Sequence, residues 1–122
     1  MDSTRDDSVL LFRPVGQAEY ELVRQSRFRA FPQRLPGQPI FYPVLNRKYA
    51  EEIARNWNTK DEASGFCGYV LRFRVRKEFL RNYEPKQVGA AEHMEYWIPS
   101  AVLDEFNRNI VGLIEVVAKF ER

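Results

Sequence analysis

The chain has 122 residues, enough for one hydrophobic core but too few for two ordinary domains. The 19 basic and 17 acidic side chains leave a net charge of only +2, so the overall charge gives no reason to expect nucleic acid or an anionic membrane as a partner. The single cysteine, Cys67, excludes an internal disulfide, and no apolar run is long enough to span a membrane. We expect a cytoplasmic protein without a membrane partner, with a disordered tail over residues 1–8 and one domain over residues 9–122.

Two short strands and one helix are predicted in the first third of the chain. Residues 9–15 are rich in β-forming side chains and predict a strand near the edge of a sheet. A helical pattern opens at Gly16. Residues 32–39 contain three prolines and a glycine, so they predict a loop, because proline continues neither a helix nor a central strand. Residues 40–45 predict a second short strand.

The clearest helical pattern follows Asn46, whose side chain can cap the first turn. Apolar residues recur there at the spacing of one buried helix face, at Ala50, Ile53, Ala54 and Trp57. The polar stretch over residues 58–65 then predicts a loop.

Residues 66–76 predict a strand with two different faces. The apolar face holds Tyr69, Leu71, Phe73 and Val75, and the other face holds Val70, Arg72, Arg74 and Arg76. Residues 77–83 predict a helical turn, and residues 92–99 contain a short apolar strand that ends at Pro99. A short helix broken by Gly112 and a strand over residues 113–120 complete an α+β pattern.

Two groups of arginines allow more than one interpretation. The first group is Arg24, Arg27, Arg29 and Arg34, and the second is Arg72, Arg74 and Arg76. The first group is typical of a solvated helix end or of a phosphate-binding lip. The second is typical of solvated or paired strand residues, or of side chains that follow a nucleic-acid backbone.

The sequence excludes several chemistries. One cysteine and one histidine, Cys67 and His93, do not supply the ligand spacing of a metal site, so no metal is expected. No phosphate-binding glycine motif and no nucleophile elbow occurs. Arg13, Tyr42 and Glu95, each on a separate predicted strand, are left as candidate functional side chains.

These three positions resemble the pattern of the ADP-ribosyltransferase superfamily, in which a first-strand basic residue, a second-motif hydroxyl residue and a late-strand glutamate form the site. The whole chain also resembles small bacterial proteins labelled "ADP-ribosylation/crystallin J1". The blocks that carry this second resemblance are Phe12-Arg13-Pro14-Val15-Gly16, Pro39-Ile40-Phe41-Tyr42-Pro43-Val44-Leu45-Asn46, Trp57-Asn58-Thr59-Lys60-Asp61 and Glu95-Tyr96-Trp97-Ile98-Pro99. It implies an ADP-ribosyltransferase-like α+β fold, with short, twisted, mainly antiparallel strands in two packed sheets and about three flanking helices.

The resemblance implies NAD as the substrate and assigns a role to each position. Arg13 would orient the nicotinamide ribose and Tyr42 would line the nicotinamide pocket. Glu95 would be the catalytic carboxylate, because a negative charge beside the developing oxocarbenium ion stabilises the transition state more than the ground state. Phe41, next to Tyr42, and His93, two residues before Glu95, would also contribute to cofactor binding.

His93 occupies the position two residues before Glu95, where arginine-modifying members carry a glutamate. The resemblance therefore implies transfer of ADP-ribose to an acceptor other than arginine, or a related RNA 2′-phosphotransferase-like reaction. Two alternatives stay open. One is a non-catalytic binding protein on the same fold, such as an immunity or antitoxin-like partner. The other is a nucleic-acid binder that uses the strand arginines.

Overall fold

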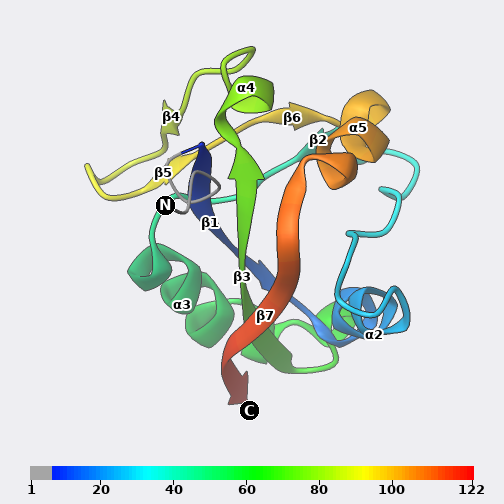
Figure 1. Cartoon of the computed structure of the whole chain (residues 1–122). Helices are drawn as coiled ribbons and strands as arrows, with labels where there is room; N and C mark the ends of the chain where they lie inside the picture. The colour runs from blue at the N-terminus through cyan, green and yellow to red at the C-terminus, as the bar shows by residue number, and fades with distance from the viewer. Residues whose placement is uncertain (1–6) are drawn as a thin grey trace.

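The computed structural model describes residues 7–122, which form a mixed α+β structure with four helices in the described part (Figure 1). The strands are β1 (Ser8–Val15), β2 (Ile40–Phe41), β3 (Cys67–Arg76), β4 (Lys86–Gln87), β5 (Met94–Glu95), β6 (Ile98–Pro99) and β7 (Ile110–Glu121). The helices are α2 (Gln17–Gln25), α3 (Arg47–Asn56), α4 (Lys77–Leu80) and α5 (Leu103–Arg108), with short 3-10 turns at Asn58–Lys60, Glu62–Ser64 and Ser100–Val102.

Most of the tail predicted over residues 1–8 lies outside the described residues. Its last residue, Ser8, does not behave as predicted, because it is the first residue of β1, is 6% exposed and pairs with Arg76. The Ser8 hydroxyl also accepts a hydrogen bond from the Arg74 guanidinium at 3.4 Å, and the Asp7 carbonyl accepts one from the Lys77 N–H at 2.8 Å. Ordered structure therefore begins ahead of residue 9.

The central sheet has the antiparallel order β1-β3-β7, with the ten-residue β3 in the middle (Figure 1). β1 pairs with β3 in one continuous register from Ser8↔Arg76 to Val15↔Tyr69. The predicted alternation of β3 is confirmed. Tyr69, Leu71, Phe73 and Val75 belong to the main hydrophobic cluster, whereas Arg72 and Arg74 are partly exposed on the other face.

Residue Val44 extends the sheet beyond β1. Its backbone exchanges two hydrogen bonds with Phe12, with N to O distances of 2.9 and 2.8 Å. Val44 also forms a bridge with Glu95, and Glu95 pairs with Lys86 in the β4–β5 pair. Val44 therefore lies between β1 and β5 and connects these two strands, although they are far apart in the sequence.

Two predicted strands are shorter than expected. In residues 40–45 only β2 and the isolated partner Val44 are paired, because Pro43 has no N–H to donate. In residues 92–99 the structure has two short strands, β5 and β6. They separate at Tyr96 and Trp97, because β5 pairs with β4 whereas β6 pairs with β2.

Two hydrophobic clusters lie on opposite faces of β1. Leu11 and Val15 belong to the larger cluster, which α2, α5 and the β2–β6 pair close on their side. Phe12 points the other way and packs with Val44 and with the α3 residues Ala50 and Ala54. The face of β1 from which a side chain points therefore determines which of the two hydrophobic clusters it joins.

Helix α3 forms as predicted, with Asn46 Oδ1 accepting a hydrogen bond from the Tyr49 N–H at 2.7 Å. It lies close to β3, where a Cβ built on Gly68 would meet the Ala54 carbonyl oxygen at 2.5 Å. The prediction that Trp57 continues the buried face is wrong, since its side chain is 60% exposed. The regular helix ends at Asn56, so the helical spacing no longer directs Trp57 inward.

Strand β7 starts earlier than predicted and contains Gly112, which was expected to end the preceding helix. Gly112 has a φ of +76° and lies in a bulge where the pairing with β3 jumps from Arg72↔Glu115 to Arg74↔Val111. Across the bulge the Ile114 N–H donates to the Phe28 carbonyl at 2.8 Å. The bulge therefore ties β7 to the turn that follows α2.

The predicted α+β class is confirmed. The finer expectation, two packed sheets with about three helices, differs in detail from the four helices, the three-stranded sheet and the two two-stranded pairs of the described residues. None of the helices within residues 7–122 has the length and apolar character that crossing a bilayer requires.

Candidate functional site

Arg13 is a buried arginine on β1, with a side chain only 9% exposed. Its Nε and Nη2 donate to the two carboxylate oxygens of Glu19, at 2.6 and 2.8 Å. Its Nη1 reaches the Tyr42 carbonyl at 3.4 Å, and its guanidinium carbon lies 4.4 Å from the centre of the Phe41 ring. Arg13 is therefore held by a two-pronged ion pair from α2 and rests on an aromatic floor.

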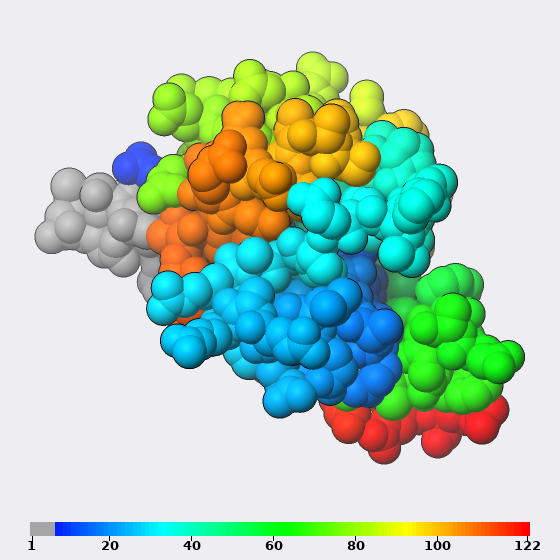
Figure 2. Space-filling view, turned by 90° about the vertical axis from the view of Figure 1, so that its right-hand side faces the viewer, coloured from blue at the N-terminus to red at the C-terminus, as the bar shows by residue number. Residues whose placement is uncertain are grey.

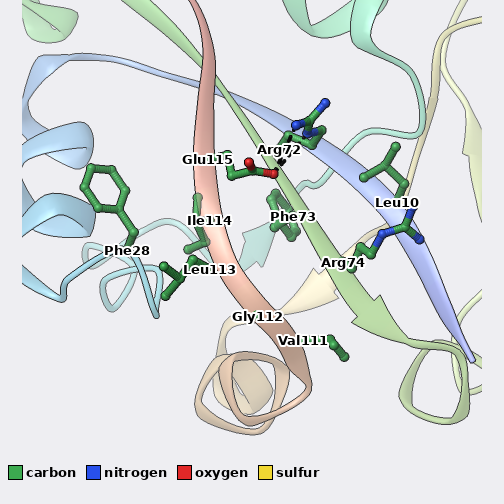
Figure 3. Close-up of a pocket in the computed structure, with 10 residues that line it drawn as sticks. All are labelled: Leu10, Phe28, Arg72, Phe73, Arg74, Val111, Gly112, Leu113, Ile114 and Glu115. Atoms are coloured by element: carbon green, nitrogen blue, oxygen red, sulfur yellow. Dashed lines mark hydrogen bonds and ion pairs between the residues drawn. The ribbon is translucent and has the colours of Figure 1, made fainter. Parts of the chain in front are cut away.

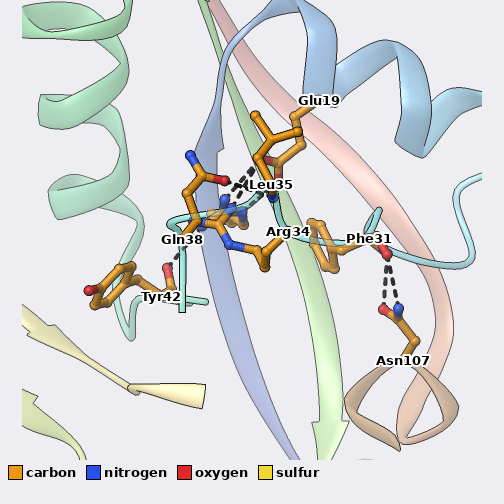
Figure 4. Close-up of polar contacts among 8 residues, drawn as sticks. Glu19, Phe31, Arg34, Leu35, Gln38, Tyr42 and Asn107 are labelled. Atoms are coloured by element: carbon orange, nitrogen blue, oxygen red, sulfur yellow. Dashed lines mark hydrogen bonds and ion pairs between the residues drawn. The ribbon is translucent and has the colours of Figure 1, made fainter. Parts of the chain in front are cut away.

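Arg34 is a second arginine at the same place, contributed by the proline-rich loop (Figure 4). Its side chain is 14% exposed, and its Nη1 lies 3.9 Å from Glu19 Oε1. Its Nε is buried without a hydrogen-bond partner in the described structure. Burial, and next the charge of Arg13, lower the pKa of Arg34 below the ordinary value of a guanidinium.

Glu95 is 9% exposed and its carboxylate is fixed by two donors. The Tyr49 hydroxyl from α3 donates to Oε2 at 3.1 Å, and the Trp97 indole N–H donates to Oε1 at 2.8 Å. Each oxygen keeps capacity to accept a further hydrogen bond. The structure thus orients this carboxylate from both sides.

His93 contacts Tyr49, one of the two side chains that donate to Glu95. Its ring stacks on the Tyr49 ring with centroids 4.3 Å apart, and its Nε2 lies 3.0 Å from Glu52 Oε2. The side chain of Asn46 also donates to the Glu92 carbonyl. These contacts attach the segment before β5 to α3, so His93 braces Tyr49, which in turn holds Glu95.

The three sequence-predicted residues do not line one cleft. Phe12, Val44 and Glu95 face one another across the bridges, so their side chains share one face of the sheet. Arg13 follows Phe12 and points to the opposite face. Tyr42 connects the two sides, because its carbonyl accepts from Arg13 while its ring meets the Trp97 ring edge-on at 6.2 Å.

Phe41 and Tyr42 differ in what they offer to a ligand. Phe41 is 1% exposed and packs against Phe31 and Phe106. Its ring therefore supports the guanidinium groups above it and is not itself open to a ligand. The Tyr42 side chain is 39% exposed, and its ring points away from Arg34 and Glu19 in Figure 4. Of this pair of predicted cofactor-binding residues, Tyr42 alone presents a free ring face.

The contact between Tyr49 and Glu95 should make the free energy of unfolding depend on pH in the alkaline range. Burial first, followed by the charge of Glu95 and their hydrogen bond, raises the pKa of Tyr49 from 10.0 to about 12. The folded state therefore holds this proton more tightly than the unfolded state. Its stabilising contribution is complete below pH 10.0 and is lost as the pH rises towards about 12. We expect Tyr49→Phe to flatten the alkaline loss of stability, measured by urea unfolding across this pH range. An unchanged pH profile would contradict it.

A cleft of about 540 Å³ lies on the arginine side, between β1, α2, the proline-rich loop and the 57–64 segment. Figure 2 views this face, where the blue and cyan segments meet the green one. Arg13, Arg34 and Tyr42 line the cleft, but Glu95 does not. We call it the arginine cleft. It does not include Glu95 with its two donors Tyr49 and Trp97, and Tyr42 contacts both groups of residues.

A second hollow, of about 640 Å³, lies where β7 bulges away from β3 (Figure 3). Arg72 and Arg74 lie beside it. Arg72 pairs with Glu115 at 3.1 Å, and Arg76 donates to the Arg108 carbonyl at 3.2 Å. With Arg74 bonded to Ser8, this geometry favours paired strand arginines over a nucleic-acid contact.

The first arginine group is also divided. Arg24 pairs with Glu21 on the exposed side of α2, at 2.6 Å, while Arg34 turns inward. These residues therefore do not form a single phosphate-binding lip. Across residues 7–122, no cluster of three or more His, Cys, Asp or Glu side chains is arranged to hold a metal ion.

Sequence reasoning did not identify three residues that the structure brings to these clusters, namely Glu19, Tyr49 and Trp97. Tyr49 stands three positions after the helix cap and Trp97 stands two positions after Glu95, and neither position by itself indicates a contact with the Glu95 carboxylate. Comparison with protein-family models, curated proteins and solved structures finds no match to this chain.

Proposed function

We propose that the protein is an ADP-ribosyltransferase-like protein, related to the small bacterial "ADP-ribosylation/crystallin J1" proteins, that binds NAD at the corner formed by Glu95, Trp97 and Tyr42. One observation carries the proposal: a nearly buried carboxylate is fixed by two side-chain donors beside two exposed aromatic rings. Trp97 is 44% exposed and Tyr42 is 39% exposed. Such rings can stack with nicotinamide or adenine.

The proposed reaction breaks the bond between ribose C1′ and the nicotinamide nitrogen, and the bonding electron pair leaves with nicotinamide. Positive charge develops on the ribose, and the Glu95 carboxylate stabilises it in a fixed direction. A non-arginine acceptor then donates an electron pair to C1′ and loses a proton. Lys86, opposite Glu95 and 5.9 Å from the Trp97 ring centre, supplies a positive charge for a phosphate.

Arg13 has an indirect role in this proposal, because it lies on the other face of the sheet. It holds the Tyr42 carbonyl and so positions the exposed ring. Tyr49 and His93 position Glu95 from the α3 side. The roles that the resemblance implies for Arg13 and His93 are therefore replaced by positioning roles.

The test is NAD binding and nicotinamide release with water as the acceptor. We expect calorimetry to detect NAD binding, and we expect Glu95→Gln to lower the rate of nicotinamide release by roughly a hundredfold or more while changing NAD affinity little. Glu92→Gln is the matched control, because Glu92 is exposed and only its carbonyl is used. Absence of NAD binding at millimolar concentration would overturn the proposal.

A non-catalytic binding protein is the second candidate. It is favoured by the bidentate pairing of Arg13 with Glu19, which occupies the side chain that the resemblance assigns to the nicotinamide ribose. This candidate predicts no nicotinamide release above the uncatalysed background, either from the unaltered protein or from Glu95→Gln. The same two measurements therefore separate the two candidates.

A further inference from the structure

The arginine cleft has a buried cation whose hydrogen bonding is incomplete. Arg34 Nε is shielded from solvent and has no partner in the described residues, and the contact from Arg34 to Glu19 is long, at 3.9 Å. Glu19 instead directs its short contacts to Arg13. A buried guanidinium with a free donor is costly, and an anion that accepts from it would remove that cost.

The charges around Arg34 define the anion that fits. Two guanidinium groups, Arg13 and Arg34, share the single carboxylate of Glu19, which leaves one positive charge in surplus. Asp61 lines the same cleft and adds a negative charge at its other wall. The surplus is local to the two guanidinium groups, because Asp61 brings the formal charge of the whole cleft to zero. A monoanion such as a carboxylate therefore meets less repulsion than a phosphate dianion, and its two oxygens match the fork of a guanidinium.

The rim of the cleft is apolar. Four exposed large apolar side chains surround it, namely Leu22 (48% exposed), Leu35 (67%), Tyr42 (39%) and Trp57 (60%). Exposed apolar groups gathered around one concave surface are typical of a binding site. The ligand should therefore carry an apolar body next to its anionic group.

The 57–64 segment of the cleft supplies an acceptor. Asn58 lines the cleft, is 4% exposed, and its Oδ1 is buried without a hydrogen-bond partner in the described part of the chain. Its Nδ2 is occupied by Ser64 Oγ at 3.0 Å, and that hydroxyl donates to Asp61 at 2.7 Å. This network fixes the amide so that its free oxygen can accept from an N–H group.

We infer that this cleft binds a carboxylate attached to an apolar side chain and a neighbouring N–H group, with Arg34 holding the carboxylate, the Trp57 side of the rim contacting the apolar group and Asn58 accepting from the N–H. An N-acylated apolar amino acid and the C-terminal residue of a peptide share this chemistry. The site shares Tyr42 with the proposed NAD corner, but Glu95 and Trp97 do not line it and Arg34 and Asn58, which would bind the carboxylate and the N–H, lie outside that corner.

The probes are N-acetyl-L-phenylalanine, its C-terminal amide, phenyl phosphate, and a short peptide ending in phenylalanine with a free or amidated terminus. Binding is followed by calorimetry and by the NMR signal of the Trp57 indole N–H. We expect the free carboxylates to bind and the amides to bind at least about tenfold more weakly, as expected for loss of a charge-assisted hydrogen bond. Tighter binding of the peptide would identify a chain end as the source of the carboxylate, and tighter binding of N-acetyl-L-phenylalanine would identify a small molecule.

Arg34→Gln should weaken carboxylate binding by about tenfold or more, whereas Arg24→Gln, an exposed arginine on α2, should leave it unchanged. Trp57→Ala should weaken the apolar contact without removing the carboxylate preference, and it keeps the test valid if Arg34→Gln fails to fold. Glu95→Gln should not alter carboxylate binding, which separates this site from the NAD proposal. Equal binding of acid and amide, tighter binding of phenyl phosphate, or no binding at millimolar concentration would overturn the inference.

Discussion

Replacing Glu19 with glutamine is expected to lower the free energy of unfolding by about 3 kcal/mol, although the two side chains have nearly the same shape. The reason is the charge that stays behind. Arg13 is 9% exposed and Arg34 is 14% exposed, and Glu19 is the carboxylate that both approach. Without it, two buried cations repel each other and lack a counterion. Urea unfolding followed by circular dichroism measures the loss.

Glu21→Gln is the matched control for this prediction. Glu21 lies two positions later on α2 and also pairs with an arginine, Arg24, at 2.6 Å. That arginine is 56% exposed, so solvent screens the pair and its loss should destabilise the fold far less than the loss of Glu19. A double variant that also carries Arg34→Gln should recover part of the stability lost in Glu19→Gln, because it removes one of the two cations. Equal losses in the two single variants would show that burial does not strengthen the Glu19 pair.

The parts of the fold with a simple local signal could be predicted from the sequence. The alternation in β3 places Leu71 and Phe73 on one side because neighbouring strand residues face opposite ways. The start of α3 follows from Asn46, whose side chain caps the helix without help from distant residues. Both signals are contained within a few consecutive residues, so no knowledge of the tertiary structure was needed.

The division of the predicted 92–99 strand into β5 and β6 could not be predicted from such local signals. Apart from Glu92, His93 and Glu95 the segment is apolar, which fits either one strand or two. The outcome depends on distant partners, since β5 pairs with β4 whereas β6 pairs with β2. The prediction that Trp57 is buried is wrong for a related reason, because helical spacing predicts burial only as far as the helix extends.

The candidate site depends most strongly on this missing information. The sequence predicted Arg13 and Glu95 as functional side chains, and the structure shows that both are nearly buried. It could not show that they occupy opposite faces, because that follows from the bridges through Val44. A shift of one residue in this pairing would bring them to the same face. Likewise, the partners Glu19 and Tyr49 carry no local signal for the contacts they make.

Phe106→Ala is expected to lower the free energy of unfolding by about 4 kcal/mol, within the range for truncating a buried phenylalanine. Phe106 is fully buried on α5, and its ring lies 5.2 Å from Phe41, 5.7 Å from Phe79 and 6.1 Å from Phe73, measured between ring centres. Alanine would remove the ring on which these three converge and leave a cavity. For a chain of this size the loss is a large part of the total stability.

The effect should extend to the arginine cleft, because Phe41 is the floor beneath Arg13. A loosened Phe41 ring would weaken both the cation contact and the hold on the Tyr42 carbonyl. Leu113→Ala is the control, since Leu113 is 57% exposed and its truncation should cost no more than about 0.5 kcal/mol. Urea unfolding gives the two free energies of unfolding, and NMR chemical shifts of the Arg13 side chain report on its contact with the Phe41 ring. Loss of stability without any change at Arg13 would mean that the aromatic cluster supports the fold but does not position the cleft.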